Sequence, residues 1–463
     1  MTQLEALSIM KTGANVFLTG EPGSGKTYVI NKYVQYLREC GIDPAVTAST
    51  GIAATHISGM TIHSWSGVGI KEKLDKYDLD KISSSQYIAK RVIRTNVLII
   101  DEVSMLSSST LSMVDAVARE IRHNSGAFGG LQVIFVGDFF QLPPIAKKIE
   151  IDLEETVLIE DTSTRFAYDS SAWSRANPIV CYLTEQHRQS DDGFSSILAA
   201  IRKNTFGEKH MASLEKRKIN KSFPEETLKL FSHNIDVDRI NNDMLAKILG
   251  SEKTFEMSSK GTVWLVETLK KGCLSPAKLS LKTSAKVMFT KNNLKEGFVN
   301  GTTGRVLGFG SGGYPIVQTS SGRKIEVMPM EWMVEENGKA RAAISQLPLR
   351  LAWAITIHKS QGMNLDEAVM DLENVFEYGQ GYVALSRVRK LSSLYLIGWN
   401  ERVFMVHPEV LAKDGFFRKS ADEAEKILGE IPKENLAKLQ ENFVKACGGK
   451  IKKKRQARSA RVL

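Results

Sequence analysis

NVFLTGEPGSGKT, residues 15–27, joins a short apolar run to a glycine-rich turn that ends in lysine and threonine. Residues 16–18 predict a buried parallel strand, and residues 20–27 match the G-x-x-x-x-G-K-[ST] phosphate-binding pattern. The glycines let backbone N–H groups point at phosphate oxygens; Lys26 adds a cation, and the Thr27 hydroxyl can ligate Mg²⁺. The loop residues expected at the nucleotide are Gly20, Pro22, Gly23, Ser24, Gly25 and Lys26. A plain glycine-rich turn is disfavoured, because a strand precedes the motif and a helical pattern follows it.

Length and composition describe an ordinary soluble chain. Its 463 residues suffice for two to four domains of ~100–200 residues each, with 42% hydrophobic and 25% charged residues. No apolar run approaches the ~18 residues of a membrane span, so we expect a cytoplasmic protein without a membrane partner. The cysteines are scattered without a C-x-x-C pair, which predicts neither a zinc ribbon nor a disulfide framework. Metal should therefore enter only with the nucleotide.

The formal charge of +10 is unevenly distributed. Residues 448–463 hold seven lysines and arginines and no acidic residue. Such a basic tail is usually a solvated extension, and it predicts weak, salt-sensitive attraction to polyanions.

Two carboxylates follow a second apolar strand at residues 97–100. After a phosphate loop, this arrangement indicates the other half of a nucleotide-hydrolysing site. Asp101 would hold Mg²⁺, and Glu102 would orient and deprotonate the attacking water. Gln141 closely follows another buried strand in LQVIFVGD, where its amide could sense the terminal phosphate or simply occupy a turn.

The segment PAVTASTGIAATHISGMTIHSW, residues 44–65, offers small polar groups and open backbone after a strand. Such groups suit sugar–phosphate contacts, although an ordinary polar loop has the same composition. The candidate DNA contacts are Ser49, Thr50, Gly51, Thr61, His63 and Ser64. Residues 66–91 are polar and poorly periodic, which predicts a small insertion between two strands of the first sheet. Residues 111–121 place apolar side chains at helical spacing, so this helix should pack on the sheet.

Several motifs together resemble the Pif (petite integration frequency) family of DNA helicases, in the B branch of helicase superfamily one. They are GEPGSGKT, TASTGIAA with TIHSW, IIDEVSM, VDAVAREIRHNSGAFGGLQVIF and GDFFQLPP. The fourth is the family's own signature, here with Ala127 where a proline is usual. The resemblance implies that Gln3 reads adenine. Because Gln3 is so near Met1, the chain resembles a bacterial or phage-like minimal core.

The resemblance also implies the fold, which is α/β with two RecA-like parallel-sheet domains that bind ATP between them. Residues 250–340 contain short segments such as TVWLVE, KVMFT, GRVLGF and YPIVQT between turns, the pattern of a small barrel. The family inserts an SH3-like β-barrel at this point. The expected domains are 1–175 with a wedge insertion at 66–91, 176–249 with 341–402, the barrel at 250–340, C-terminal helices at 403–447 and the tail at 448–463.

In the second half the site residues rest on motif resemblance. Arg188 and Arg387 resemble the two arginines that reach the nucleotide phosphates, and Gln361 and Gly362 approach the nucleotide. The expected DNA contacts of this half are His233, Asn234, Thr356, His358 and Lys359.

The resemblance thus implies an ATP- and Mg²⁺-dependent helicase that moves 5′ to 3′ on single-stranded DNA. It would unwind duplexes with a 5′ single-stranded tail in replication, repair or recombination, with 66–91 as the wedge. A translocase that strips proteins without unwinding, and a non-motor DNA-binding module regulated by ATP, remain alternatives. We expect a monomer, with dimerisation on DNA left open.

Overall fold

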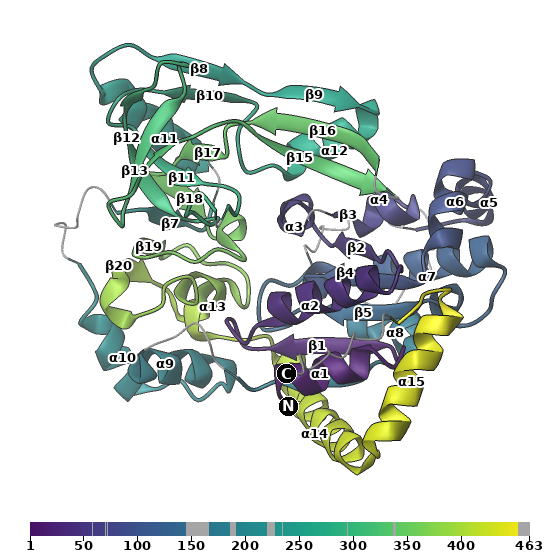
Figure 1. Cartoon of the computed structure of the whole chain (residues 1–463). Helices are drawn as coiled ribbons and strands as arrows, with labels where there is room; N and C mark the ends of the chain where they lie inside the picture. Colours follow the sequence, from purple (N-terminus) through teal and green to yellow (C-terminus); the bar gives the residue numbers. More distant parts are fainter. Residues whose placement is uncertain are drawn as a thin grey trace, which may run out of the picture.

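A computed structural model describes residues 1–57, 59–69, 71, 73–144, 166–185, 191–219, 227–233, 235–293, 295–336 and 339–451. Two parallel β-sheets lie in separate lobes, each with helices around it (Figure 1). This confirms the predicted α/β fold with two parallel-sheet domains.

The first sheet has six strands in the order β3-β2-β4-β5-β1-β6, and all neighbours are parallel. The strands are β1 (Val16–Gly20), β2 (Ala45–Ala48), β3 (Met60–Thr61), β4 (Val97–Asp101), β5 (Gln132–Val136) and β6 (Ile179–Leu183). The helices are α1 (Gln3–Met10), α2 (Lys26–Glu39), α3 (Gly51–His56), α4 (Ile62–Ser66), α5 (Lys76–Ser83), α6 (Gln86–Arg94), α7 (Ser108–Arg122) and α8 (Ser171–Ala176).

Both faces of this sheet are buried, because successive side chains of a strand point to opposite sides. Val16 and Leu18 join one core with α1 and α2, whereas Phe17 joins a second core with α7 and α8. Helix α7 buries Val114 and Ile121 against the sheet, as the helical spacing predicted.

The insertion at residues 66–91 lies between β3 and β4, as expected, but it is mostly helical. Helices α5 and α6 bury Ile82 and Val92, and the Asp75 side chain caps α5 by accepting from the Asp78 N–H. With few apolar positions in each short helix, the sequence shows little periodicity.

The second sheet has four parallel strands in the order β18-β7-β19-β20. They are β7 (Lys229–Phe231), β18 (Ala354–Thr356), β19 (Ala368–Leu372) and β20 (Leu394–Trp399), with α9 (Asp192–Arg202), α10 (Glu208–Glu215), α11 (Ile235–Lys247) and α13 (Gln380–Leu385). The expected boundary at residue 175 falls short, because β6 pairs with β1 and extends the first sheet to Leu183.

The inserted region consists of antiparallel strands in three sheets. A five-stranded sheet has the order β14-β13-β12-β11-β17, a pair joins β10 to β8, and a third sheet has the order β15-β16-β9. The strands are β8 (Lys253–Glu256), β9 (Ser258–Gly261), β10 (Lys278–Leu281), β11 (Lys286–Phe289), β12 (Thr303–Phe309), β13 (Pro315–Thr319), β14 (Lys324–Glu326), β15 (Met330–Glu336), β16 (Lys339–Gln346) and β17 (Leu349–Leu351). Because β17 pairs with β11, this region extends beyond the expected end at residue 340.

One expected strand of this region is wrong. In TVWLVE, all residues after Thr262 lie in α12 (Val263–Gly272), which buries Leu265, Val266 and Leu269. The apolar pattern continues at helical spacing past Glu267, so a helix buries it better than a strand would.

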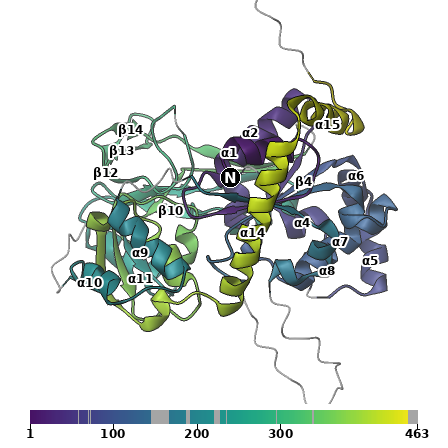
Figure 2. The same cartoon turned by 90° about the horizontal axis from the view of Figure 1, so that it is seen from below.

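The C-terminal helices return to the first lobe. Helix α14 (Pro408–Glu430) crosses the underside of the molecule between the lobes, and α15 (Lys433–Ala446) packs beside α1 and α2 (Figure 2). Phe417 of α14 enters the aromatic cluster of Phe17 and Trp173, with ring centroids 5.1 and 6.5 Å away. The segment 403–447 is therefore built onto the first domain.

Candidate nucleotide and DNA sites

The phosphate loop joins the end of β1 to the start of α2, as predicted. Gly25 caps α2 with φ of 90°, in the left-handed region, and a Cβ atom there would overlap the side chain of Gln3. Gln3 in turn donates from Nε2 to the Ser24 carbonyl at 3.0 Å. The N-terminal helix therefore braces the loop from outside.

Lys26 folds back onto this loop. Its Nζ donates to the carbonyl oxygens of Gly20 and Glu21, at 2.7 and 3.2 Å. Burial lowers the pKa of Lys26, and the nearby carboxylates of Asp138, Glu102 and Asp101 oppose that shift. The ammonium thus lies among anions, at the start of a helix whose free N–H groups attract a further anion.

Asp101 ends β4, and Glu102 follows in a left-handed conformation with φ of 52°. Burial, followed by repulsion from Asp101, raises the pKa of Glu102 to about 7, while Lys26 and Arg387 act in the opposite direction. Burial also raises the pKa of Asp101, whose Oδ1 accepts from the Glu102 N–H at 2.9 Å. A carboxylate with a pKa near neutrality is suited to take a proton from water.

Glu102 also receives a hydrogen bond from the other domain. Gln361, which follows β18, donates from Nε2 to Glu102 Oε2 at 3.1 Å and to Gln141 Oε1 at 3.4 Å. Gln141 reaches Asp138 Oδ2 with its own Nε2, at 3.5 Å. The predicted residues Glu102, Gln141 and Gln361 therefore meet at one point between the domains.

A cleft of about 440 Å³ opens at this point. Nine of the residues that line it were expected from the sequence: Pro22, Gly23, Gly25, Lys26, Thr27, Glu102, Gln141, Gly362 and Arg387. Asn364 and Arg389 also line it. Within the described ranges, Ser24 Oγ and Asn364 Oδ1 are buried without a hydrogen-bond partner. The Ser24 hydroxyl can donate to a phosphate oxygen, whereas the Asn364 amide oxygen can only accept a hydrogen bond.

Arg387 forms the opposite wall of the cleft and is 1% exposed. Its guanidinium donates to the carbonyls of Val383, Ser360 and Met363, at 2.8, 3.3 and 3.3 Å. The arginine is thus held in place by its own domain. Arg188, predicted as its companion, lies outside the described residues.

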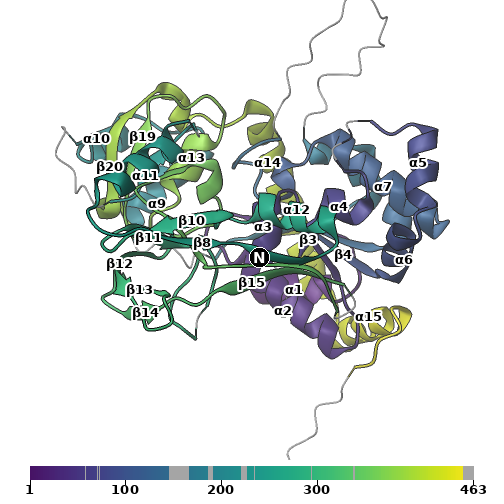
Figure 3. The same cartoon turned by 90° about the horizontal axis from the view of Figure 1, so that it is seen from above.

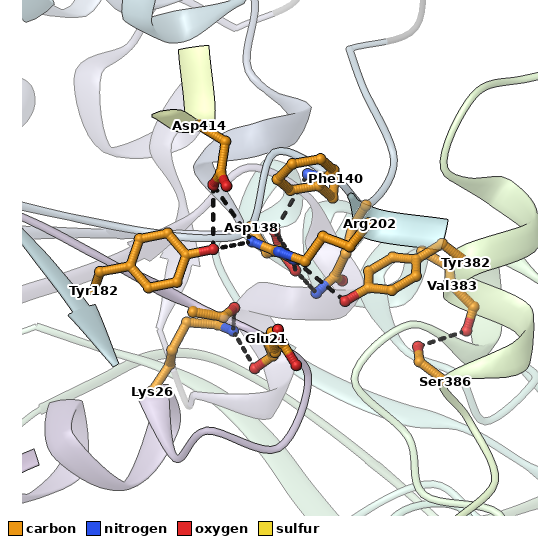
Figure 4. Close-up of polar contacts among 12 residues, drawn as sticks. Glu21, Lys26, Asp138, Phe140, Tyr182, Arg202, Tyr382, Val383, Ser386 and Asp414 are labelled. Carbon is orange, nitrogen blue, oxygen red and sulfur yellow. Dashed lines mark hydrogen bonds and ion pairs between the residues drawn. The ribbon is translucent and has the colours of Figure 1, made fainter. Parts of the chain in front are cut away.

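Arg202, which the sequence reasoning missed, joins both domains behind the nucleotide cleft (Figure 4). From α9 it makes two 2.8 Å bonds to the Asp138 carboxylate, and it donates to the hydroxyls of Tyr182 and Tyr382, at 2.8 and 3.3 Å. Its face packs on Phe140, 4.0 Å from the ring centroid. Phe194 and Leu198 precede Arg202 at helical spacing, so a charge on the apolar face of a helix was the available signal.

Helix α14 completes this cluster. Asp414 accepts from the Tyr182 hydroxyl at 3.1 Å, and Arg418 donates to Asp414 and to Tyr182, each at 2.7 Å. Strand β6, helix α9 and helix α14 are therefore tied together around one buried guanidinium.

The predicted DNA contacts of the first domain lie around the start of α4. Thr61 caps this helix, since its Oγ1 accepts from the Ser64 N–H at 3.2 Å, and His63 lies between them. Thr50 directly precedes α3, which begins at Gly51, and Ser49 is buried directly after β2. Gly51, Thr61, His63 and Ser64 line one groove.

In the second domain, His233, Thr356, His358 and Lys359 lie near the ends of β7 and β18. The rings of His233 and His358 both stack near Phe376, with centroids 5.1 and 6.4 Å away. Phe376 is 53% exposed and was not predicted. Asn234 lies outside the described residues.

Burial lowers the pKa of Lys359, with Arg350 adding to the shift.

None of the helices in the described ranges is both long enough and apolar enough to cross a bilayer.

Comparisons with known proteins agree with this arrangement. A family model described as PIF1-like helicase matches residues 2–211. The ATP-dependent DNA helicase Pif1 of Psychrobacter sp. (strain PRwf-1) is 41% identical, over 98% of this chain and 76% of its own length.

Two solved structures of Bacteroides Pif1 are similar over most of the chain. The complex with ADP-AlF4 has 27% sequence identity and a TM-score of 0.79, covering 91% of this chain and 97% of that chain. The structure bound to ssDNA has 28% identity and a TM-score of 0.63 over the same shares.

Proposed function

The chain belongs to the PIF1-like helicase family, and from that premise we propose that it moves 5′ to 3′ along single-stranded DNA and unwinds duplexes during replication, repair or recombination. The observation that carries the proposal is the hydrogen bond from Gln361 to Glu102, because it joins the second domain to the candidate catalytic base of the first. ATP in this cleft would touch both domains, so its hydrolysis would change how they are held together.

The proposed chemistry uses residues from both walls of the cleft. Lys26 would bind the outer phosphates, and Glu102 would accept a proton from the attacking water with Gln141 beside it. Arg387, together with Arg188, would stabilise the charge that develops on the transferred phosphoryl group. Mg²⁺ bound with the nucleotide would neutralise phosphate charge, and Thr27 and Asp101 are suited to hold it.

The DNA strand would cross both domains on the side that carries Thr61, Ser64, His358 and Lys359. Contacts through hydroxyls, histidines and backbone groups address the sugar–phosphate chain, so binding should be sequence-tolerant and salt-dependent. Phe376, exposed beside the His233 and His358 rings, adds a stacking surface. The helices of residues 66–91 would act as the wedge, and two copies could assemble on one DNA molecule.

Strand displacement tests the proposal. Labelled duplexes with either a 5′ or a 3′ single-stranded tail are incubated with ATP and Mg²⁺, using the wild type and Lys26→Ala. We expect displacement from the 5′-tailed duplex alone and none by the variant, which should still bind DNA.

Displacement from the 3′ tail alone would overturn the polarity. ATP hydrolysis stimulated by single strands without displacement would favour a translocase. DNA binding without stimulated hydrolysis would favour a non-motor module.

A further inference from the structure

A groove of about 920 Å³ runs between the first domain and α12 of the inserted region. Thr61, His63 and Ser64 line one wall, and Tyr87 and Arg91 of α6 extend that wall into the insertion at residues 66–91. Trp264, Thr268 and Lys271 of α12 line the other wall. Figure 3 shows α12 lying beside α3 and α4.

The chemistry of the lining is one-sided. Among the residues that the structure describes, hydroxyls, glycines, a histidine, two aromatic rings, one isoleucine and two cations contribute to it, and no aspartate or glutamate does. Cations interspersed with aromatic rings are typical of surfaces that hold single-stranded nucleic acid.

Two features hold the walls in register. The rings of Tyr87 and Trp264 meet edge to face, with centroids 6.3 Å apart. At the end of α12, a Cβ atom on Gly51 would lie 2.7 Å from the Gly272 Cα, so only this glycine pair permits the approach of α12 to α3. Trp264 is therefore positioned against the predicted DNA residues by backbone packing.

The Tyr87 and Trp264 rings differ in how much of their surface is accessible to a ligand. The Tyr87 ring lies near the guanidinium groups of Arg91 and Arg341, 4.9 and 5.8 Å from its centroid. Trp264 remains 43% exposed at the groove. Tyr87 thus acts as a supporting wall, and Trp264 offers the free aromatic surface.

We propose that Trp264 is the stacking platform for an unpaired base of single-stranded DNA in this groove, with Lys271 beside a flanking phosphate. The inference rests on the proposed function, since it requires single-stranded DNA, and it assigns a binding role to the inserted region. An apolar peptide is a poorer occupant, because hydroxyls and cations would face its side chains.

Binding of a fluorescent oligo-dT to the full chain is measured by anisotropy for Trp264→Ala, Trp264→Phe and Val263→Ala. Val263 is the matched control, because it is 77% exposed on the same helix and does not line the groove. We expect about tenfold weaker binding for Trp264→Ala and near wild-type binding for the other two, since one base–aromatic stack contributes about this much.

A second measurement uses oligonucleotides that each lack one base. One abasic position should weaken binding to the wild type, and the same position should have no further effect on Trp264→Ala. DNA-independent ATP hydrolysis of each variant checks that the chain is folded.

Equal binding by Trp264→Ala and Val263→Ala, or an abasic effect that survives in Trp264→Ala, would overturn the inference while leaving the helicase function intact. Failure of the wild type to bind oligo-dT would overturn both.

Discussion

Replacing Glu102 with glutamine should stabilise the nucleotide-free protein at alkaline pH while it removes activity. Glu102 is buried beside Asp101, and its pKa is raised from the usual 4.5 to about 7. Glutamine retains an amide oxygen that can accept the hydrogen bond from Gln361, but it carries no charge. Loss of a general base should lower kcat by about 10²–10⁴.

The sign of the stability effect follows from linkage. A group whose pKa is higher in the folded state favours folding below its unfolded pKa, and this contribution is lost as pH rises through the folded pKa. Between pH 4.5 and about 7 the unfolded chain releases the Glu102 proton while the folded chain retains it. Above that range, ionised Glu102 opposes folding by about 3 kcal/mol relative to low pH, and Glu102→Gln should regain this amount.

Thermal unfolding midpoints of wild type and Glu102→Gln at pH 5 and pH 8, without nucleotide, test this reasoning. The variant should unfold at a higher temperature than wild type at pH 8, with a smaller difference at pH 5. Glu120→Gln, on the exposed side of α7, is the control. Its unfolding midpoint should not rise above that of wild type at pH 8. If the unfolding midpoints of wild type and Glu102→Gln differed by the same amount at pH 5 and pH 8, the reasoning that a buried, ionised Glu102 opposes folding would be refuted.

Three further outcomes are expected. Arg387→Ala should lower the ATPase kcat by about 10³ with little change in nucleotide affinity, because an arginine at the transferred phosphoryl group acts mainly in the transition state; an unchanged kcat would exclude the assignment. Arg202→Met should lower the free energy of unfolding by about 3–5 kcal/mol, as it leaves the fully buried Asp138 carboxylate without its ion pair, and denaturant titration measures this. Removing residues 452–463 should flatten the salt dependence of single-strand binding without abolishing ATP hydrolysis, and an unaltered slope would assign no DNA contact to the tail.

The parts of the fold that could be predicted are those specified by local sequence. Residues 16–18 and 97–100 form continuous apolar runs, and in the structure they are fully buried neighbours of β5. The phosphate loop likewise depends on glycines and a lysine that are adjacent in sequence, so its geometry follows from a short pattern. This pattern contains the cleft residues Pro22, Gly23, Gly25, Lys26 and Thr27.

Long-range contacts were not predictable in this way. Arg202 contacts Asp138 and Tyr182 only when β5, β6 and α9 are packed together. These residues are far apart in sequence, so no local pattern predicts the contact. Helix α12 was mistaken for a strand, because VWLVE alone fits either periodicity and its helical partner Leu269 lies farther along the chain. The edge of the first sheet was misplaced for the same reason, since pairing of β6 with β1 is non-local.

The return of α14 to the first lobe has a consequence for biosynthesis. Phe17 lies near the start of the chain, whereas its packing partner Phe417 lies near the end. At ~5–20 residues per second, a ribosome would expose the aromatic cluster of the nascent first domain for on the order of tens of seconds before Phe417 emerges. A nascent chain released before α14 would display this uncovered surface, so premature termination should yield aggregation-prone fragments and chaperones should bind translating ribosomes at this stage.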